Sequence, residues 1–374
     1  MQFKKPKIRN HILVVPFNNK VSVGNTYQSA IEIEDETGVI KEILFLCDGI
    51  NTIDDIYTEV IRKGYTVSKD EVVELLDRLS CYPYIMEEGL VLSDIPQKLL
   101  ERYSRNLNFL SNFDKWGDKK FDYLFKIINS TILVLGIGGV GSPIVYDLAA
   151  LGVKKIVAID FDIVDETNLN RQILYREKHI GMKKIYAAKE TVNEFNSHVE
   201  FVGLDMKINS TDDLEEILES YRPMCVVCSA DKPPVKIYKW VNEACVKRNI
   251  PYIYGGNTET TAFFQTVVPH NSSCFECYEH HLKNNFNKEG YAKYVSIMEN
   301  NYSSQNNCTA ASSSALASFM IFDFIRLITG FEKPLSLNRR MFIDFKTNEI
   351  DSEYIPVNQN CNICSKSNKL KKEV

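Results

Sequence analysis

A glycine-rich turn between an apolar strand and a helix constrains this chain more than any other feature. Residues 131–135, Thr-Ile-Leu-Val-Leu, are apolar enough for a buried parallel strand, and they lead into Gly136-Ile-Gly138-Gly139-Val-Gly141-Ser. These glycines fit the pattern G-x-G-x-x-G, in which glycine permits a tight turn and lets the backbone approach a phosphate at a helix N-terminus. The turn therefore predicts a nucleotide-binding α/β fold.

Strands and helices alternate after this turn. Further apolar strands are expected at 155–159, 224–228 and 251–254, and helical segments at 142–150, 183–196 and 235–248. Such βαβ alternation is typical of a Rossmann-like, doubly wound and mostly parallel sheet.

Composition limits the partners of the chain. Its 374 residues correspond to a prior of about two or three domains. The net charge of −5 argues against a protein that coats nucleic acid or anionic lipid. We find no secretory signal and no apolar run of about 18 residues, the length that a membrane span needs. A cytoplasmic protein without nucleic-acid or membrane partners is therefore expected.

The first part of the chain predicts a small α+β unit of the winged-helix type. Strands are expected at 12–15 and 30–34, and helices at 54–63 and 69–79, with Thr52 and Ser68 as their N-caps. A hairpin is expected over 84–92. The pattern resembles the PqqD-like modules that recognise peptides. The alternative is a packing or dimerisation domain that has no ligand of its own.

Three further motifs follow the glycine turn. They are the string from Asp160-Phe-Asp162 to Asn168-Leu-Asn-Arg171-Gln172, then Gly181-Met-Lys-Lys184, then Ser229-Ala-Asp231. The turn and Asp160 alone would also fit a nicotinamide dehydrogenase. The complete set, over residues 101–365, resembles the ATP-dependent adenylating enzymes related to ubiquitin activation, the ThiF/MoeB superfamily. A dehydrogenase has no need for two cations and an acid that converge on a phosphate chain.

This resemblance implies a role for each polar residue. Asp160 would hold the ribose hydroxyls of ATP or another nucleoside triphosphate, and Asp231 would bind Mg²⁺. Preplaced cations stabilise the negative charge that builds up as pyrophosphate leaves. Asn168 and Lys184 have structural alternatives, as a turn cap and as a solvated helix lysine. The implied nucleotide-binding set is Gly136, Gly138, Gly139, Gly141, Asp160, Asp162, Asn168, Arg171, Gln172 and Lys184, in which Arg171 and Lys184 contact phosphates and Gln172 supports Arg171.

Upstream, Arg102-Tyr-Ser-Arg105 resembles the R-Y-x-R segment that precedes the nucleotide domain in this superfamily. There the second arginine reaches the ATP site of the partner subunit. The resemblance implies a homodimer in which Arg105 acts in trans. The alternative is an arginine on an amphipathic connecting helix.

Four of the ten cysteines form two C-x-x-C knuckles, Cys274-Phe-Glu-Cys277 and Cys361-Asn-Ile-Cys364. Each knuckle can present two thiolates to a tetrahedral ion. In the superfamily this pair of knuckles is a structural zinc site. The alternative is two independent cysteine pairs in turns. Cys225 and Cys228 lie in an apolar strand and are expected in the core, and Cys47, Cys81 and Cys245 are also expected to be buried. A nucleophilic role for Cys308, ahead of a helix at 309–318, stays open.

The predicted architecture is a peptide-recognition domain (1–95), a connecting helical segment (96–125) and an adenylating domain (126–374). Residues 278–307 are rich in Asn, Lys, Tyr and Ser, and they correspond to a mobile crossover loop over the substrate carboxyl group in relatives. A further helix from Leu316 to Ile328, stopped by Gly330, is expected at a dimer interface.

This architecture resembles the MccB-like enzymes that make microcin C-like antibiotics. There a ribosomal peptide is clamped and its C-terminal asparagine is activated. A first adenylation yields a succinimide, whose nitrogen attacks a second nucleotide. Two alternatives remain: adenylation of a ubiquitin-like sulfur carrier that ends in Gly-Gly, and a non-catalytic leader-peptide binding partner of an azoline-forming enzyme.

Overall fold

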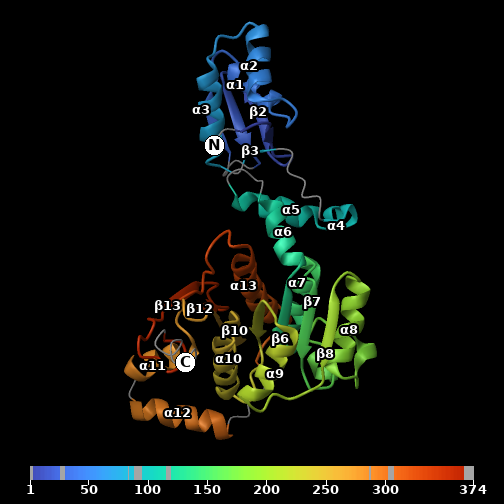
Figure 1. The fold of residues 1–374 in the computed structure, drawn as a ribbon, viewed down its shortest axis with the longest axis vertical. Helices are drawn as coiled ribbons and strands as arrows, with labels where there is room; N and C mark the ends of the chain where they lie inside the picture. The colour runs from blue at the N-terminus through green and yellow to red at the C-terminus, as the bar shows by residue number, and fades with distance from the viewer. Residues whose placement is uncertain are drawn as a thin grey trace. The chain divides into compact units, whose positions relative to one another are not determined.

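The computed structural model describes residues 3–25, 30–82, 84–87, 95–114, 119–285, 288–301 and 307–365. The chain forms two compact units, Met1–Phe125 and Lys126–Val374, which Figure 1 colours from blue to red along the sequence. Each unit has a hydrophobic core of its own. The finer functional division at residues 95 and 125 stays a prediction.

The first unit contains two small antiparallel sheets and three helices that share one core. Strands follow the order β2-β3-β4 in the larger sheet, and β1 pairs with β5 in the smaller one. The elements are β1 (Pro6–Ile8), β2 (Leu13–Phe17), β3 (Lys20–Gly24), β4 (Ile31–Glu34), α1 (Val39–Leu46), α2 (Ile53–Arg62), α3 (Lys69–Leu79) and β5 (Ile85–Glu87).

The predicted N-caps of α2 and α3 are confirmed. The Thr52 hydroxyl accepts the backbone N–H of Asp55 at 3.2 Å, and the Asp55 carboxylate accepts the Thr52 N–H at 2.9 Å. Ser68 and Glu71 form the same reciprocal pair at the start of α3. Both boxes satisfy backbone donors that the first turn of a helix leaves unpaired. In the predicted hairpin at 84–92, the first strand is β5, which pairs with β1; residues 88–92 lie outside the described residues, so the hairpin stays a prediction.

Arg9 connects the N-terminal strands to the helices that follow them within the first unit. Its fully buried guanidinium donates to the Ser111 hydroxyl and to the Asp114 carbonyl. Burial lowers the pKa of Arg9 to about 10. The helices after the small sheets are α4 (Gln97–Arg102), α5 (Ser104–Leu110), the 3₁₀ turn η1 (Ser111–Phe113) and α6 (Lys120–Ile128), the last of which continues into the second unit.

The second unit is built on one sheet in the order β13-β12-β11-β10-β9-β6-β7-β8. The strands from β10 to β8 in this order are parallel, and β11, β12 and β13 extend the sheet in antiparallel fashion. This confirms the predicted Rossmann-like, mostly parallel sheet. The strands are β6 (Thr131–Leu135), β7 (Lys155–Ile159), β8 (Glu200–Leu204), β9 (Cys225–Cys228), β10 (Tyr252–Asn257), β11 (Thr261–Val267), β12 (Arg339–Asp344) and β13 (Ile350–Tyr354).

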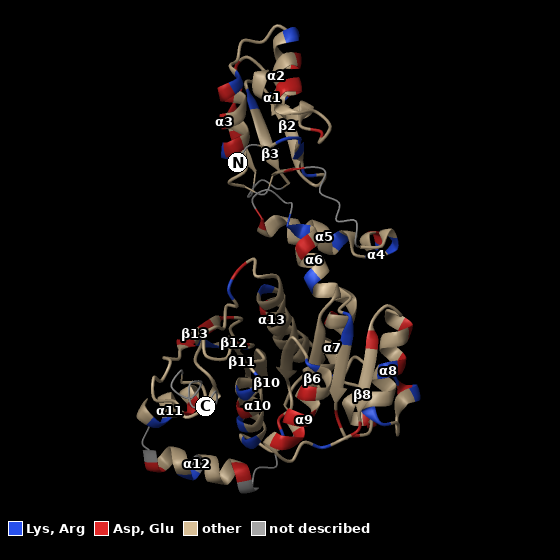
Figure 2. Cartoon of the chain, viewed as in Figure 1, with Lys and Arg blue, Asp and Glu red and all other residues tan. Residues whose placement is uncertain are grey.

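Helices cover both faces of this sheet (Figure 1). Helix α13 packs on β10, β11 and α7, whereas α10 packs on β9 and β10 and α9 packs on α10. Helix α9 contains acidic residues and α10 contains both acidic and basic ones (Figure 2), and Arg248, just after α10, pairs with Glu219 of α9 at 2.8 Å. The helices are α7 (Gly141–Leu151), α8 (Lys184–Phe195), α9 (Thr211–Tyr221), α10 (Lys236–Lys247), α11 (Phe275–Asn285), α12 (Lys288–Asn301) and α13 (Ala310–Thr329), and the 3₁₀ turns are η2 (Glu166–Asn168) and η3 (Glu177–His179).

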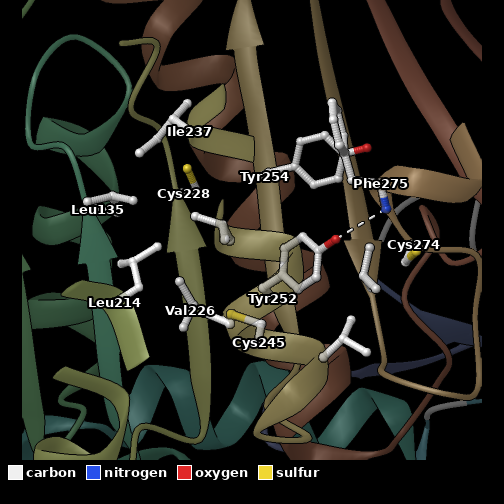
Figure 3. Packing of buried hydrophobic residues seen from close by; sticks show 14 of the residues in the cluster. Leu135, Leu214, Val226, Cys228, Ile237, Cys245, Tyr252, Tyr254, Cys274 and Phe275 are labelled. Atoms are coloured by element: carbon white, nitrogen blue, oxygen red, sulfur yellow. Dashed lines mark hydrogen bonds between the residues drawn. The ribbon is translucent and has the colours of Figure 1, made fainter. Parts of the chain in front are cut away.

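The core under α9 and α10 fixes the start of α11. Figure 3 shows Tyr252 and Tyr254 of β10 packed beside Cys228 and Phe275. The Tyr252 hydroxyl donates to the Asn242 carbonyl oxygen at 2.7 Å and accepts the Phe275 N–H at 3.3 Å. Since Phe275 follows the first cysteine of a knuckle, these bonds tie that knuckle to the sheet.

Helix α13 is a single element where two helices were expected. Thr309 caps its N-terminus, and Gly330, with a φ of 74°, ends it as predicted. Among the described helices, only α13 is long and apolar enough to cross a membrane by length and hydropathy. A core helix passes the same test, and α13 buries Leu316, Met320 and Phe324 inside the second unit.

The segment predicted as an irregular crossover loop is helical in its described part. Helix α11 extends to Asn285 and α12 covers Lys288–Asn301, whereas residues 286–287 and 302–306 lie outside the described residues. The prediction of an irregular backbone here is therefore wrong, and the role of the segment over a substrate stays a prediction.

Candidate active site

The glycine turn at the end of β6 requires glycine at its first and last positions, Gly136 and Gly141. A Cβ on Gly141 would lie 2.0 Å from the Gly136 carbonyl oxygen, which in turn accepts the Ser229 hydroxyl at 2.8 Å. Gly136 itself has a φ of 82°, a conformation that glycine adopts without strain. The turn therefore brings the backbone of β6 and β9 together at the head of α7.

Asp160 fixes the glycine turn from the end of β7. One of its carboxylate oxygens accepts the Ile137 N–H and the other accepts the Asp162 N–H, both at 2.9 Å. The side chain is buried and lies where the sequence predicts the ribose-binding acid. The structure adds a second function, because the same carboxylate orients the backbone of the turn.

Two residues that sequence reasoning missed fix the opposite side of the turn. The Tyr175 hydroxyl donates to the Ile137 carbonyl at 2.8 Å, and the Ser142 hydroxyl accepts the Leu174 N–H at 2.7 Å. Burial raises the pKa of Tyr175 well above its usual value, so the phenol stays a donor. No motif in the sequence marks these two contacts.

Lys184 and Asp162 form an ion pair at the edge of the site. The Lys184 ammonium lies 2.9 Å from the Asp162 carboxylate, and its backbone N–H donates to the Asp162 carbonyl. The lysine is buried while the carboxylate remains half exposed. The alternative of a solvated helix lysine is therefore wrong, and a buried cation is available beside the glycine turn.

Asn168 ends η2, and Arg171 lies in the turn three residues further on. The Arg171 guanidinium donates to the Thr167 carbonyl at 2.7 Å and to the Asn170 side chain at 3.0 Å. The Asn168 side chain accepts the Asp165 N–H, which is the turn-capping alternative. Within the described chain, no hydrogen bond joins Gln172 to Arg171, so the support predicted for Arg171 is not seen.

Three buried polar atoms around the glycine turn have no hydrogen-bond partner among the described residues. They are Arg171 Nε, Gln172 Oε1 and Asn257 Oδ1. Gly138 faces Gln172, since a Cβ there would lie 3.9 Å from its amide nitrogen. Such unsatisfied groups are rare in a folded core and are costly unless a partner binds. A ligand rich in hydrogen-bonding groups, such as a nucleoside triphosphate, fits this arrangement.

Gly139 faces the side chains of Ser313 in α13 and of Cys308, which lies just before that helix. A Cβ on Gly139 would lie 3.3 Å from the Ser313 hydroxyl and 3.5 Å from the Cys308 sulfur. The Asn257 amide nitrogen donates to the same Ser313 hydroxyl at 3.3 Å. Cys308 is half-buried, and no contact identifies it as a nucleophile. Asn257 and Ser313 are additional candidate site residues, because β10 and α13 meet only in the fold.

The contacts described so far do not include Asp231 or Arg105. Asp231 lies in an exposed turn three residues after β9, on the same strand end as Ser229. Arg105 is exposed on α5 in the first unit. The roles of these two residues, and those of the other nucleotide-site residues, stay predictions.

The two cysteine knuckles meet in the second unit. The sulfurs of Cys274, Cys277, Cys361 and Cys364 lie within 4.8 Å of one another, and all four residues are buried. Adjacent sulfurs are 3.5 to 3.9 Å apart. Zinc–sulfur bonds of about 2.3 Å in a tetrahedron require sulfurs about 3.8 Å apart, so the donor set fits a closed Zn²⁺ site.

The other cysteines are mostly core residues. Cys225 and Cys228 are buried, and burial raises the pKa of the Cys228 thiol to about 12. Cys47 and Cys245 are buried as expected, but Cys81 is exposed, so that prediction is wrong. Cys81 follows the last turn of α3, where the chain leaves the core.

The fold and the two sites define a nucleotide-binding α/β enzyme with a closed four-cysteine cluster. The sequence model of the ThiF family matches residues 103–365. This chain therefore belongs to the ThiF family.

Similar sequences include enzymes of several pathways. SUMO-activating enzyme subunit 2 of Dictyostelium discoideum is 32% identical over 47% of this chain and 25% of its own length. Adenylyltransferase and sulfurtransferase MOCS3-1 of Zea mays is 31% identical over 53% of this chain and 40% of its own length. This chain thus spans less than half of either protein. Protein HesA, heterocyst, of Trichormus variabilis is 25% identical, over 71% of this chain and 88% of its own.

Solved structures match nearly the whole chain, including its first unit. Escherichia coli MccB with AMPCPP and MccA has a TM-score of 0.78 at 23% identity, covering 96% of this chain and 99% of MccB. MccB with ATP matches equally well at 22% identity. PaaA has a TM-score of 0.69 at 19% identity, covering 93% of this chain and 99% of PaaA. These similarities establish the fold.

Proposed function

We propose that this enzyme is a peptide nucleotidyltransferase, which adenylates the C-terminal carboxyl group of a short ribosomal peptide and converts it into a peptide nucleotide. The observation that carries the proposal is the first unit. It lies mostly outside the ThiF match, yet the similarity to MccB, solved in complex with MccA, includes it. A module appended to an adenylating domain is expected to select the substrate.

The larger sheet of the first unit offers one free edge for an extended peptide. Pro16 lies within β2 and has no N–H to donate, which blunts that edge. At the other edge, β4 pairs with β3 alone among the described strands. The half-buried side chains of Ile31 and Ile33 flank this edge. A peptide can therefore add as a fourth strand beside β4, with backbone hydrogen bonds supplying affinity.

The second unit would carry out the chemistry. A carboxylate oxygen of the peptide attacks the α-phosphorus of ATP, the bond to pyrophosphate breaks, and an acyl-adenylate forms. Arg171 and Lys184 supply positive charge where negative charge develops. In the MccB-like reaction, the side-chain amide nitrogen of the C-terminal asparagine then attacks the activated carbonyl, displaces AMP and closes a succinimide. That nitrogen attacks a second nucleotide, pyrophosphate leaves, and a P–N bond forms.

Adenylation of a Gly-Gly carrier is the second candidate, and the sequence similarity to the MOCS3 protein of Zea mays favours it. A binding-only protein is less consistent with the chain, because Arg171, Lys184 and Asp231 are all present.

The decisive experiment is ATP–pyrophosphate exchange with two substrate panels. One contains ribosomal peptides that end in asparagine, the other ubiquitin-like carriers that end in Gly-Gly, and product masses are recorded for both. We expect exchange with the peptides and a mass gain of one nucleotide. Exchange stimulated only by the carriers would overturn the proposal, and absence of nucleotide binding would favour the binding-only protein. Hydrogen exchange gives a second arm: the peptide should protect β4 amides and leave β2 unchanged.

A further inference from the structure

Arg340 of β12 is a buried cation clamped between aromatic rings. Its guanidinium carbon lies 3.9 Å from the ring centre of Phe263 and 4.0 Å from that of Tyr278, with Tyr254 at 5.7 Å. Only 6% of the residue is exposed. The three rings come from β11, α11 and β10, so the sheet and the first helix of the crossover segment build one aromatic box around the guanidinium.

This guanidinium has no anionic partner among the described residues. Its Nη1 is buried and finds no hydrogen-bond acceptor there. The buried acid on α11, Glu279, already has partners: its carboxylate accepts a hydrogen bond from the Tyr291 hydroxyl at 2.9 Å and pairs with the Lys239 ammonium at 3.6 Å. A buried charge is normally paired, and an unpaired one destabilises the fold. The chain therefore maintains an unsatisfied donor where methionine or leucine would pack at lower cost.

The box lies at the end of the sheet that carries the nucleotide residues. A Cβ on Gly256 of β10 would lie 3.5 Å from the Tyr238 hydroxyl and 3.6 Å from the Phe263 ring. The charges of both Asp231 and Arg340 act on Tyr238. Tyr238 also packs on two rings of the box, with ring centres 5.3 Å from Tyr254 and 6.4 Å from Phe263.

We propose that Arg340 binds a carbonyl or carboxylate group in the last residues of the acyl substrate and so positions the terminal carboxyl group for adenylation. Guanidinium presents a planar fork of donors that matches such oxygens, and the flanking rings fix the orientation of that plane. Arg340 is then a positioning residue. The oxygen reaches Nη1 when the Tyr278 ring moves aside. That the acyl substrate is a peptide rests on the proposed function.

The test compares Arg340→Met with Arg339→Met. Arg339 precedes Arg340 on β12, but its side chain is exposed and donates to the Ser352 hydroxyl, so it is a matched control. For each full-length variant we would measure melting temperature, ATP affinity, and the KM for the acyl substrate in pyrophosphate exchange. Two short probes, N-acetyl-Gly-Asn and N-acetyl-Gly-Gly, would report binding of the terminal residues without the leader.

For Arg340→Met we expect an unchanged or higher melting temperature, unchanged ATP affinity, and a KM raised roughly tenfold or more, the effect of losing a charge-assisted hydrogen bond. Arg339→Met should match the wild type. A lower melting temperature with unchanged KM would assign Arg340 a structural role and overturn the inference. If only N-acetyl-Gly-Gly binds, and binds through Arg340, the peptide function fails and the inference survives. If peptides are adenylated equally by both variants, the inference fails and the function stands.

Discussion

Asp231 is the residue whose loss should separate chemistry from folding. It is exposed in the turn after β9, so Asp231→Ala removes no buried contact. If Asp231 holds Mg²⁺ beside the phosphates, turnover should fall by roughly 10²–10³-fold, the usual loss for a group that stabilises charge in a transition state. Pyrophosphate exchange measures the loss, while circular dichroism and zinc content should stay unchanged. Asp212→Ala, an exposed acid on α9, is the control. Retained turnover in Asp231→Ala would refute the role.

Asp147 of α7 gives a prediction about pH. Burial raises its pKa to about 6 from a usual value near 3.8. The folded chain therefore holds the proton more tightly than the unfolded chain, and the free energy of unfolding falls as the pH rises from about 4 to about 6. Asp147→Asn should be more stable than the wild type at pH 8, by about 1 kcal/mol once the remaining solvent contact is allowed for. Melting curves of both proteins at pH 4 and pH 8 test this, since the difference should vanish at pH 4.

At the scale of elements, the four-cysteine cluster closes the second unit. It joins the start of α11 to the chain that follows β13, 87 residues apart. Cys277→Ser should lose zinc and lower the free energy of unfolding by about 3 kcal/mol or more, because metal binding is coupled to folding. Cys81→Ser, at an exposed thiol, should change neither quantity. Zinc analysis and chemical denaturation measure both. Since four thiolates leave no open coordination position, activity should decline only in parallel with the folded fraction.

The sequence predicts elements well where local chemistry specifies them. Helix α3 begins at the predicted residue and α2 begins one residue before it, because Ser68 and Thr52 satisfy backbone donors three residues ahead. The crossover segment was mispredicted, since its Asn, Lys and Tyr residues show no clear apolar period, and α11 and α12 are instead held by long-range contacts. The Lys239 ammonium of α10, for example, lies 3.1 Å from Glu299 of α12.

The candidate site residues also fall into two groups, those that sequence motifs predict and those that only the fold brings together. Contiguous motifs identify Asp160, Arg171 and Lys184, because the residues of one turn or strand end are close in sequence. Ser313, Tyr175 and Arg340 enter through the packing of distant elements, and nothing within the sequence near them marks a function. In addition, the sequence does not reveal that Asp160 accepts bonds from the glycine turn, which is a property of the folded backbone.

At the scale of the whole molecule, the proposed function requires two separate binding events. The first unit would capture the leader of a peptide, and the second would activate its far end. Capture at one place raises the effective concentration of the terminal carboxyl group at the other. Weak binding of the terminal residues would then suffice. This agrees with the proposal that one positioning arginine, Arg340, holds the end of the substrate.

The predicted homodimer can be tested through Arg105 and Asp231. If Arg105 acts on the partner's site, Arg105→Ala and Asp231→Ala proteins should each be inactive, yet a mixture should recover activity. In a mixed dimer, the site with an intact Asp231 receives the intact Arg105 of the other subunit. Half of the dimers are mixed after random exchange, and each has one good site of two, so a symmetric dimer should recover about a quarter of the wild-type rate. An arginine that acts within its own subunit leaves every site incomplete, and no activity returns. Pyrophosphate exchange after mild unfolding and refolding of the mixture therefore distinguishes the two arrangements, with each variant refolded alone as the control.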